Sequence, residues 1–155
     1  MQIQLIAIGT RMPGWVESGF DDYAKRLPRE WHFQLREIPL RHRGKTGDSR
    51  RLVAEEGRQM LAALGKARGI ALDSRGTQWD TEELADKLGG WLQEGRDLGF
   101  LIGGPEGLAP ACLQRAEIHW SLSRLTFPHP LVRILVVEQL YRAWTLLQGH
   151  PYHRR

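Results

Sequence analysis

The sequence predicts an α/β domain with a mainly parallel sheet and helices on both faces. Short apolar stretches that suit buried strands alternate with longer stretches whose apolar residues recur at helical spacing. The chain has 155 residues, a length typical of one domain with its own core, and it contains no linker, internal repeat or low-complexity tract. We therefore expect residues 1–155 to fold as a single domain.

In the first part of the chain, turn residues set the expected bounds of each element. A short apolar stretch over residues 2–8 closes at Gly9 and predicts the first strand. Apolar and aromatic residues at helical spacing over 15–27, ended by Pro28, predict a helix. Alternating apolar side chains over 31–38 then predict the second strand.

The middle of the chain repeats the order of helix and strand. A stretch whose apolar residues share one helical face ends at Gly65, and residues 69–73 predict a third strand. Asp80 and Glu83 have the spacing of a capping box and predict the start of the next helix. An apolar stretch over 98–102 predicts the fourth strand.

The last third contains the most apolar helix. Residues 108–117 predict a short helix and residues 119–125 a strand. The final helix begins near Pro130 and ends near Gly149, which gives it a length of about 27 Å. Because few of its residues are charged, we expect it to be buried on most sides, partly by a second copy of the chain.

Basic residues are concentrated in one segment. Residues 41–51 contain five Lys or Arg and one Asp, and five minus one equals the net charge of +4 carried by the whole chain. With two glycines and no apolar residue inside it, this segment suits a basic loop that binds a phosphate backbone, although a solvated loop is the alternative. The five basic residues are Arg41, Arg43, Lys45, Arg50 and Arg51.

Composition excludes several classes of protein. Hydrophobic residues make up 41% of the chain and charged residues 26%, which excludes a disordered or fibrous protein. Cys112 is the single cysteine and favours an intracellular protein. Residues 1–4 do not resemble a signal peptide, and charges interrupt the apolar stretch over 131–147. We expect a cytoplasmic protein with no membrane partner.

Two turns in the last third are candidate sites. Residues 101–107 (LIGGPEG) follow a predicted strand, where glycines allow a ligand to approach the backbone, although a tight turn alone is the alternative. Their spacing matches neither a Walker A loop nor a Rossmann fingerprint. His129 stands between Pro128 and Pro130 at the start of the last helix, as a candidate base or as an ordinary helix-cap or surface residue.

Several motifs occur together in one order along the chain. They are LIAIGT (5–10), LIGGPEG (101–107), WSLS (120–123), PHPLVR (128–133), EQLYRAW (138–144) and HPYHR (150–154). This series resembles the SPOUT class of methyltransferases and, within it, the pseudouridine N3-methyltransferases of the large ribosomal subunit. The resemblance covers essentially the whole chain.

The resemblance implies a fold, a cofactor and an assembly. Proteins of this class have a deep trefoil knot in the C-terminal part of the chain. They bind S-adenosylmethionine (S-adenosyl-L-methionine) in the knotted loops and work as homodimers. Carried over to this sequence, the cofactor-binding residues are Leu72, Gly103, Leu122, Ser123, Arg124, Leu125, Thr126 and Phe127.

The implied reaction is methylation of N3 of a pseudouridine in helix 69 of 23S rRNA, on the assembled 70S ribosome. His129 suits a base that takes the N3 proton. Arg142 either stabilises the anionic edge of the base or forms an ordinary ion pair with Glu138. In the tail, Tyr152 is expected to stack on a base and Arg154 to pair with a phosphate. We expect the basic segment of one subunit to hold the RNA while its partner performs the chemistry, with no metal.

Three alternatives stay open on the sequence alone. The first is a related methyltransferase that acts on transfer RNA, for example at a ribose 2′-hydroxyl. The second is a ribosome-associated protein that has kept the fold and lost the activity. A metal-dependent hydrolase using His129, His150 and His153 is disfavoured, because no carboxylate-rich cluster accompanies these histidines.

Overall fold

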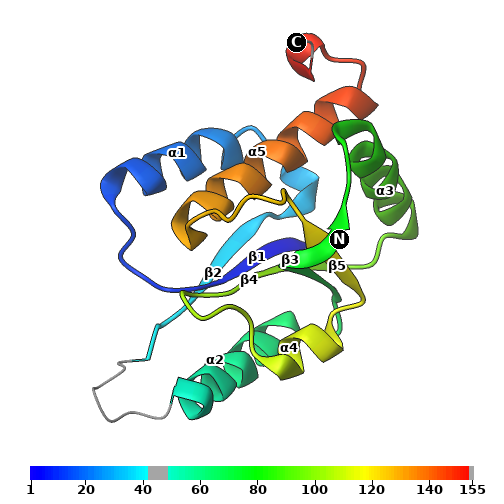
Figure 1. Ribbon diagram of the computed structural model, residues 1–155. Coiled ribbons are helices and arrows are strands. Elements are labelled where there is room, and N and C mark those ends of the chain that lie inside the picture. The colour runs from blue at the N-terminus through cyan, green and yellow to red at the C-terminus, as the bar shows by residue number, and fades with distance from the viewer. Residues whose placement is uncertain (42–48, 154–155) are drawn as a thin grey trace.

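The computed structural model describes residues 1–41 and 49–153 and contains one parallel five-stranded sheet. The strand order is β2-β1-β4-β3-β5, so the first strand lies near the centre of the sheet (Figure 1). All four strand pairs are parallel, which confirms the predicted sheet type. The strands are β1 (Ile3–Ile8), β2 (Gln34–Ile38), β3 (Arg68–Gln78), β4 (Leu98–Ile102) and β5 (Ile118–Ser121).

Helices cover both faces of the sheet, as predicted. The helices α1, α3 and α5 pack on one face and α2 and α4 on the other (Figure 1). Alternate residues of β1 contribute to the two cores, with Leu5 in the first and Ile6 in the second, so every residue of β1 is buried. The helices are α1 (Gly14–Ala24), α2 (Ser49–Leu64), α3 (Thr81–Glu94), α4 (Pro110–Arg115) and α5 (His129–Leu147), with short 3-10 turns at Arg29–Trp31 and Pro151–His153.

Four predicted boundaries differ from the structure by three residues or more. The first helix ends at Ala24, although the sequence predicts that it continues to residue 27. The second strand begins three residues later than predicted, because His32 has a positive φ of 47° after the 3-10 turn. The third strand continues to Gln78 beyond an irregularity that alternation did not reveal. The fifth strand ends at Ser121, where Ser123 begins a turn by accepting a hydrogen bond from the Leu125 amide.

The capping box is confirmed. The side chain of Asp80 accepts a hydrogen bond from the Glu83 amide at 2.8 Å, and the Asp80 amide donates to the Glu83 side chain at 3.5 Å. This cap fixes the start of α3 immediately after β3 ends. The described helices include none that is long and apolar enough to cross a membrane.

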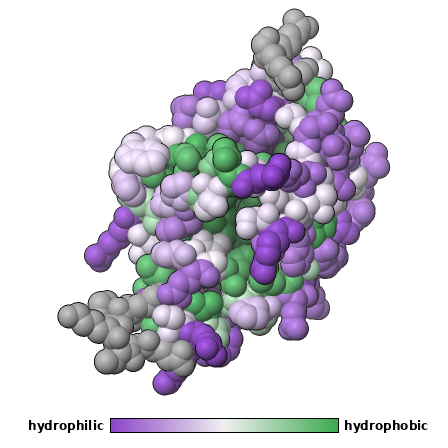
Figure 2. Space-filling model, viewed as in Figure 1, coloured by the Kyte–Doolittle hydropathy of each residue, from purple (hydrophilic) through white to green (hydrophobic). Residues whose placement is uncertain are grey.

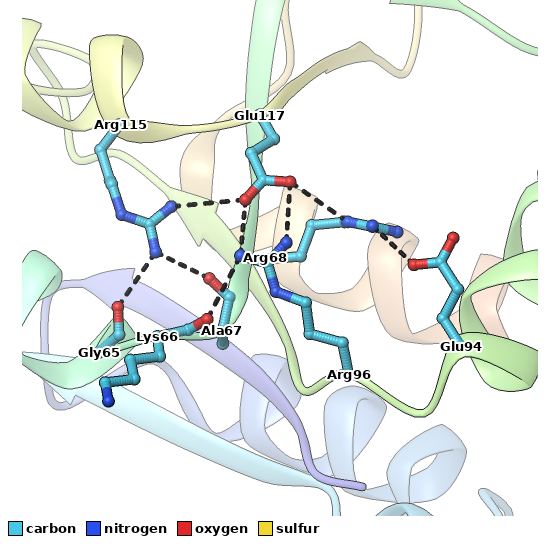
Figure 3. Close-up of polar contacts among 8 residues, drawn as sticks. All are labelled: Gly65, Lys66, Ala67, Arg68, Glu94, Arg96, Arg115 and Glu117. Atoms are coloured by element: carbon cyan, nitrogen blue, oxygen red, sulfur yellow. Dashed lines mark hydrogen bonds and ion pairs between the residues drawn. The ribbon is translucent and has the colours of Figure 1, made fainter.

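Charged residues form a network at the amino ends of β3, β4 and β5 (Figure 3). The Glu117 carboxylate accepts two hydrogen bonds from Arg96, at 2.6 and 3.1 Å, and one from Arg68 at 3.4 Å. Arg68 also donates to Glu94 at 2.6 Å, while Arg115 donates to the carbonyls of residues 65 and 67. The network joins segments that are distant in sequence.

We expect Glu117→Gln to lower the free energy of unfolding by about 1 kcal/mol at pH 7, because the carboxylate is partly exposed. The pKa of Glu117 is lowered, and the hydrogen bonds from Arg96 are the largest cause. The stabilisation by the Glu117 carboxylate is therefore fully present above the pKa that this group has in the unfolded chain. It is lost as the pH falls through the lower pKa of the folded protein. Urea unfolding at pH 7 and in acid measures this difference, with Asp86→Asn as an exposed control. A difference that persists unchanged in acid would contradict the expectation.

Candidate active site

A pocket lies at the carboxyl ends of β3, β4 and β5 and is closed on one side by the start of α5. In the space-filling view, apolar residues reach the surface in the middle of the face, between the two helical layers (Figure 2). Seven of the eight predicted cofactor residues line the pocket, and Arg124 is the exception, with an exposed side chain. Those seven are Leu72, Gly103, Leu122, Ser123, Leu125, Thr126 and Phe127. The structure thus brings together segments 50 residues apart in sequence.

One wall of the pocket is a bulge in β3. Leu72 and Thr77 both pair with Trp120, so the four residues between them leave the ladder. A Cβ atom on Gly76 would lie 2.8 Å from the Trp120 amide nitrogen, which explains the glycine. Trp120 itself is buried and stacks on Trp79 with ring centroids 5.3 Å apart. The bulge is therefore held against a rigid aromatic support.

Asp73 lies at the start of this bulge and lines the pocket. Its carboxylate accepts a hydrogen bond from the Arg75 amide at 3.0 Å and lies 3.5 Å from Nδ1 of His119. Burial would raise the pKa of Asp73, but these hydrogen bonds and the charge of Arg75 outweigh it and lower the pKa. The pocket wall therefore carries a negative charge at neutral pH, which suits a cationic ligand.

The glycine turn after β4 brings two backbone segments into contact. The Gly107 amide donates to the Gly104 carbonyl at 2.9 Å. A Cβ atom on Gly103 would lie 2.7 Å from both the Gly107 oxygen and the Leu108 nitrogen, closer than real Cβ atoms come to backbone. Only glycine fits at position 103 without a backbone shift, so this side of the pocket is formed by main chain.

The loop after β5 is held in shape by its own serines. The Ser121 hydroxyl donates to the Ser123 carbonyl, and the Ser123 hydroxyl accepts from the Leu125 amide, both at 3.0 Å. The Leu125 side chain is 71% exposed at the rim of the pocket. An apolar side chain in that position suits contact with a ring of a bound ligand.

His129 begins α5 and lines the same pocket. Its Nδ1 atom is buried and has no hydrogen-bond partner among the described residues. Burial and, to a smaller extent, the charge of Arg133 lower the pKa of His129 below its ordinary value of 6.5. The imidazole is therefore neutral at pH 7 and can accept a proton.

Arg142 and Tyr152 form a second cluster around Glu138. Arg142 donates to the Glu138 carboxylate at 2.6 and 2.8 Å, so the predicted ion pair is present. The Tyr152 hydroxyl also donates to Glu138 at 3.2 Å, and the Arg142 guanidinium lies 5.0 Å from the centre of the Tyr152 ring. Burial and then the charge of Glu138 raise the pKa of Tyr152 to about 12, so its hydroxyl stays protonated. The hydrogen bond to Glu138 likewise raises the pKa of Arg142.

The pocket with His129 and the cluster of Arg142, Tyr152 and Glu138 lie at opposite ends of α5. His129 and Arg142 are 13 residues apart, which separates them by about 20 Å along a helix. One copy of the chain therefore does not bring these predicted catalytic residues together. Arg154, also predicted to contact substrate, lies outside the described residues.

The described part of the basic segment flanks α2. The Arg41 amide donates to the buried Glu56 carboxylate at 2.8 Å, and its guanidinium lies 3.1 Å from Glu55. Arg50 and Arg51 are exposed in the first turn of α2. The other predicted RNA-binding residues, Arg43 and Lys45, fall outside the described residues. Across residues 1–41 and 49–153, no three side chains form a group that could hold a metal ion.

Sequence reasoning did not single out Asp73, which lines the pocket, or Arg133, which lies beside His129 over Gly9. Asp73 and Arg133 stood in stretches assigned to a strand and to an apolar helix. A signal existed for Arg133, since it follows His129 by four residues and so shares its helix face. The contact between Asp73 and His119 had no such signal, because it depends on the pairing of β3 with β5.

Comparison with known proteins identifies similar chains. The family described as predicted SPOUT methyltransferase matches residues 1–153. The chain is 61% identical over 154 residues to ribosomal RNA large subunit methyltransferase H of Alkalilimnicola ehrlichii, covering 99% of each chain.

Two solved structures share the fold at low sequence identity. A probable methyltransferase from Bordetella pertussis Tohama I has a TM-score of 0.60 and 17% identity, over 91% of this chain and 93% of its own. A tRNA (m1G37) methyltransferase from Aquifex aeolicus has a TM-score of 0.56 and 14% identity, over 92% of this chain and 70% of its own. At this level of identity the likeness concerns the fold alone.

Proposed function

The chain belongs to the SPOUT methyltransferase family, and on that basis we propose that it transfers a methyl group from S-adenosylmethionine to N3 of a pseudouridine in large-subunit ribosomal RNA. Family membership makes the chain a methyltransferase. The relative with 61% identity over 99% of both chains is named for large-subunit ribosomal RNA, which supports the same class of substrate here. We place the target in helix 69 of 23S rRNA on the assembled 70S ribosome, and therefore place the protein in the cytoplasm.

One observation carries the choice of cofactor. Seven residues that the family resemblance assigns to S-adenosylmethionine, from three separate segments, line a single pocket. The glycine at position 103 lets the turn pack closely, so that main chain forms this wall of the pocket, and Asp73 supplies a negative charge that suits a cationic cofactor. When bound, S-adenosylmethionine supplies an electrophilic methyl group on a sulfonium centre.

Side chains of this protein position the target base and accept the proton that its N3 atom loses. In the proposed reaction N3 of the pseudouridine would lose its proton and bond to the methyl carbon, whose bond to sulfur would break to leave S-adenosylhomocysteine. The neutral imidazole of His129 takes that proton, because it lines the pocket and its pKa lies below 6.5. Arg142 stabilises the negative charge that develops on the edge of the base. Tyr152 stacks on the base, and Arg154 pairs with a phosphate.

We further propose that the chain works as a homodimer with the trefoil knot of its family. The helix α5 separates His129 from Arg142 by about 20 Å, which supports a site in which the partner subunit supplies the cluster of Arg142 and Tyr152 to the His129 pocket. Beside the pocket, Trp79, Leu122, Phe127 and Leu135 line a cleft whose apolar surface a second copy would cover.

A shared site predicts complementation between two inactive variants. We expect His129→Gln and Arg142→Ala each to lose methyl transfer as homodimers. In a randomly mixed population about half of the dimers are mixed, and each contains one intact site of two, which restores about a quarter of the wild-type rate. Methyl transfer after mixing and exchange of subunits measures this recovery. No recovery, with mixed dimers shown to form, would contradict the shared site.

The exposed arginines of α2 are expected to contact RNA. The charge reversals Arg50→Glu and Arg51→Glu together should weaken ribosome binding by about tenfold or more and reduce its dependence on salt concentration. Cofactor binding should stay unchanged, because α2 lies on the other face of the sheet from α5. Filter binding across a salt series measures the affinity for ribosomes and its salt dependence, with Lys66→Glu, an exposed residue just before β3, as the control. Unchanged affinity and salt dependence would rule out this surface.

The substrate class is tested by methyl transfer from labelled S-adenosylmethionine. We expect label in 23S rRNA when ribosomes from a strain lacking this activity are used, and none in transfer RNA assayed in parallel. Label in transfer RNA alone would assign the related activity instead. No label together with no cofactor binding would indicate a protein that has kept the fold without catalysis.

A further inference from the structure

Arg133 is a charged residue in the interior of the protein. Its side chain is 1% exposed, among the largest that the fold buries completely. It donates hydrogen bonds to Glu37 at 2.7 Å, to the Gly9 carbonyl at 2.8 Å and to the Ile8 carbonyl at 3.2 Å. A buried ion pair contributes little net stability compared with apolar packing, so stability alone does not account for this arginine.

The acceptors of Arg133 lie where the first strand ends beside the pocket. Ile8 is the last residue of β1, and Gly9 has a φ of 111°, a conformation that favours glycine. A Cβ atom on Gly9 would lie 3.5 Å from Nη2 of Arg133 and 3.8 Å from Cε1 of His129. The guanidinium and the imidazole therefore both lie over Gly9, one helical turn apart on α5.

We propose that Arg133 is a positioning residue for methyl transfer. It fixes the carboxyl end of β1 against the first turn of α5, and its charge favours the neutral imidazole of His129. This inference rests on the proposed role of His129 as the base. The partial positive charge at the amino end of α5 also favours the neutral imidazole of His129.

Of the other charged groups near His129, two are already paired and two line a separate cleft that contains Arg133 but not His129. Glu37 on β2 is bonded to Arg133, and Asp73 on β3, which lines the same pocket, is bonded to Arg75 and lies beside His119. On α1, Glu17 and Asp21 line a cleft together with Arg133 and Glu37. Arg133 is thus the charged group that acts on His129 from its own helix.

The charge effect is tested by NMR titration of the His129 imidazole, which requires no turnover. Glu37→Gln leaves the positive charge of Arg133 uncompensated and should lower the pKa of His129 by about half a unit. Arg133→Met removes the charge and should raise that pKa by about half a unit or more. Glu30→Gln, which removes an exposed charge, is the control. If neither Glu37→Gln nor Arg133→Met moves the pKa, the proposal is overturned.

The positioning effect is tested by activity across pH. Arg133→Lys keeps the charge but cannot reproduce the guanidinium geometry that reaches three acceptors, so it should reduce kcat by about tenfold and leave the pKa of His129 in place. Wild-type kcat for Arg133→Lys would overturn the positioning role. Because Glu37 is partly exposed, Glu37→Gln keeps the charge test available if Arg133→Met does not fold. If the proposed function itself is wrong, the wild-type protein will show no methyl transfer, while the variants will still change the pKa of His129 measured by NMR.

Discussion

Replacing Gly103 with alanine is expected to weaken S-adenosylmethionine binding by about 100-fold or more. The added Cβ atom would lie 2.7 Å from the Gly107 oxygen and the Leu108 nitrogen, and both are backbone atoms that cannot rotate away. Moving that backbone displaces the main-chain wall of the pocket, and a cost of about 3 kcal/mol corresponds to a 100-fold change in affinity. Titration calorimetry with S-adenosylmethionine measures the effect.

The matched control is Gly90→Ala. Gly90 lies in α3, and a Cβ atom there would meet nothing within 4 Å. This change should leave binding unaltered and slightly stabilise the helix. Wild-type affinity in a folded Gly103→Ala protein would show that the cofactor does not bind against this turn.

The second large effect is expected for His129→Gln. Loss of a general base typically reduces the rate by about 100-fold to 10,000-fold, and we expect the single-turnover rate constant of methyl transfer to fall by a factor in that range. Glutamine retains much of the size of the side chain, so cofactor binding should change little. The measurement is single-turnover methyl transfer to ribosomes. The control is His32→Asn, because asparagine tolerates the left-handed backbone that His32 adopts.

The pH dependence of the reaction gives a second check on His129. A base must be unprotonated, so kcat/KM should rise with pH through the pKa of His129. Because burial and then Arg133 lower that pKa, the rise should lie below pH 6.5. In His129→Gln this rise should be absent. A rise at the same pH in the variant would assign the titration to another group.

The fold was largely predictable because strands and helices differ in apolar periodicity. The short apolar stretch ending at Gly9 and the capping box at Asp80 both predicted their elements at nearly the observed positions. Boundaries set by turns were harder to predict. His32 takes a positive φ that no residue pattern around it indicates, and the extension of β3 beyond Asp73 depends on its pairing with β5.

Residue chemistry singled out the glycine turn over 101–107 and His129, but the family resemblance was needed to predict the rest of the pocket. Leu72, Gly103 and Phe127 have no feature that marks them as neighbours in the sequence, yet they line one cavity. The contacts of Arg133 could not be predicted, since they require knowing that the end of β1 lies against the start of α5. The distance along α5 between His129 and Arg142 follows from helix geometry once the helix is accepted.

The central claim concerns the atom that receives the methyl group. Ribosomes from a strain lacking this activity are incubated with the protein and S-adenosylmethionine, and the 23S rRNA is then digested to nucleosides and fragments for mass spectrometry. We predict N3-methylpseudouridine in helix 69. A methyl group found only on a ribose, only in transfer RNA, or nowhere despite bound cofactor would contradict the claim.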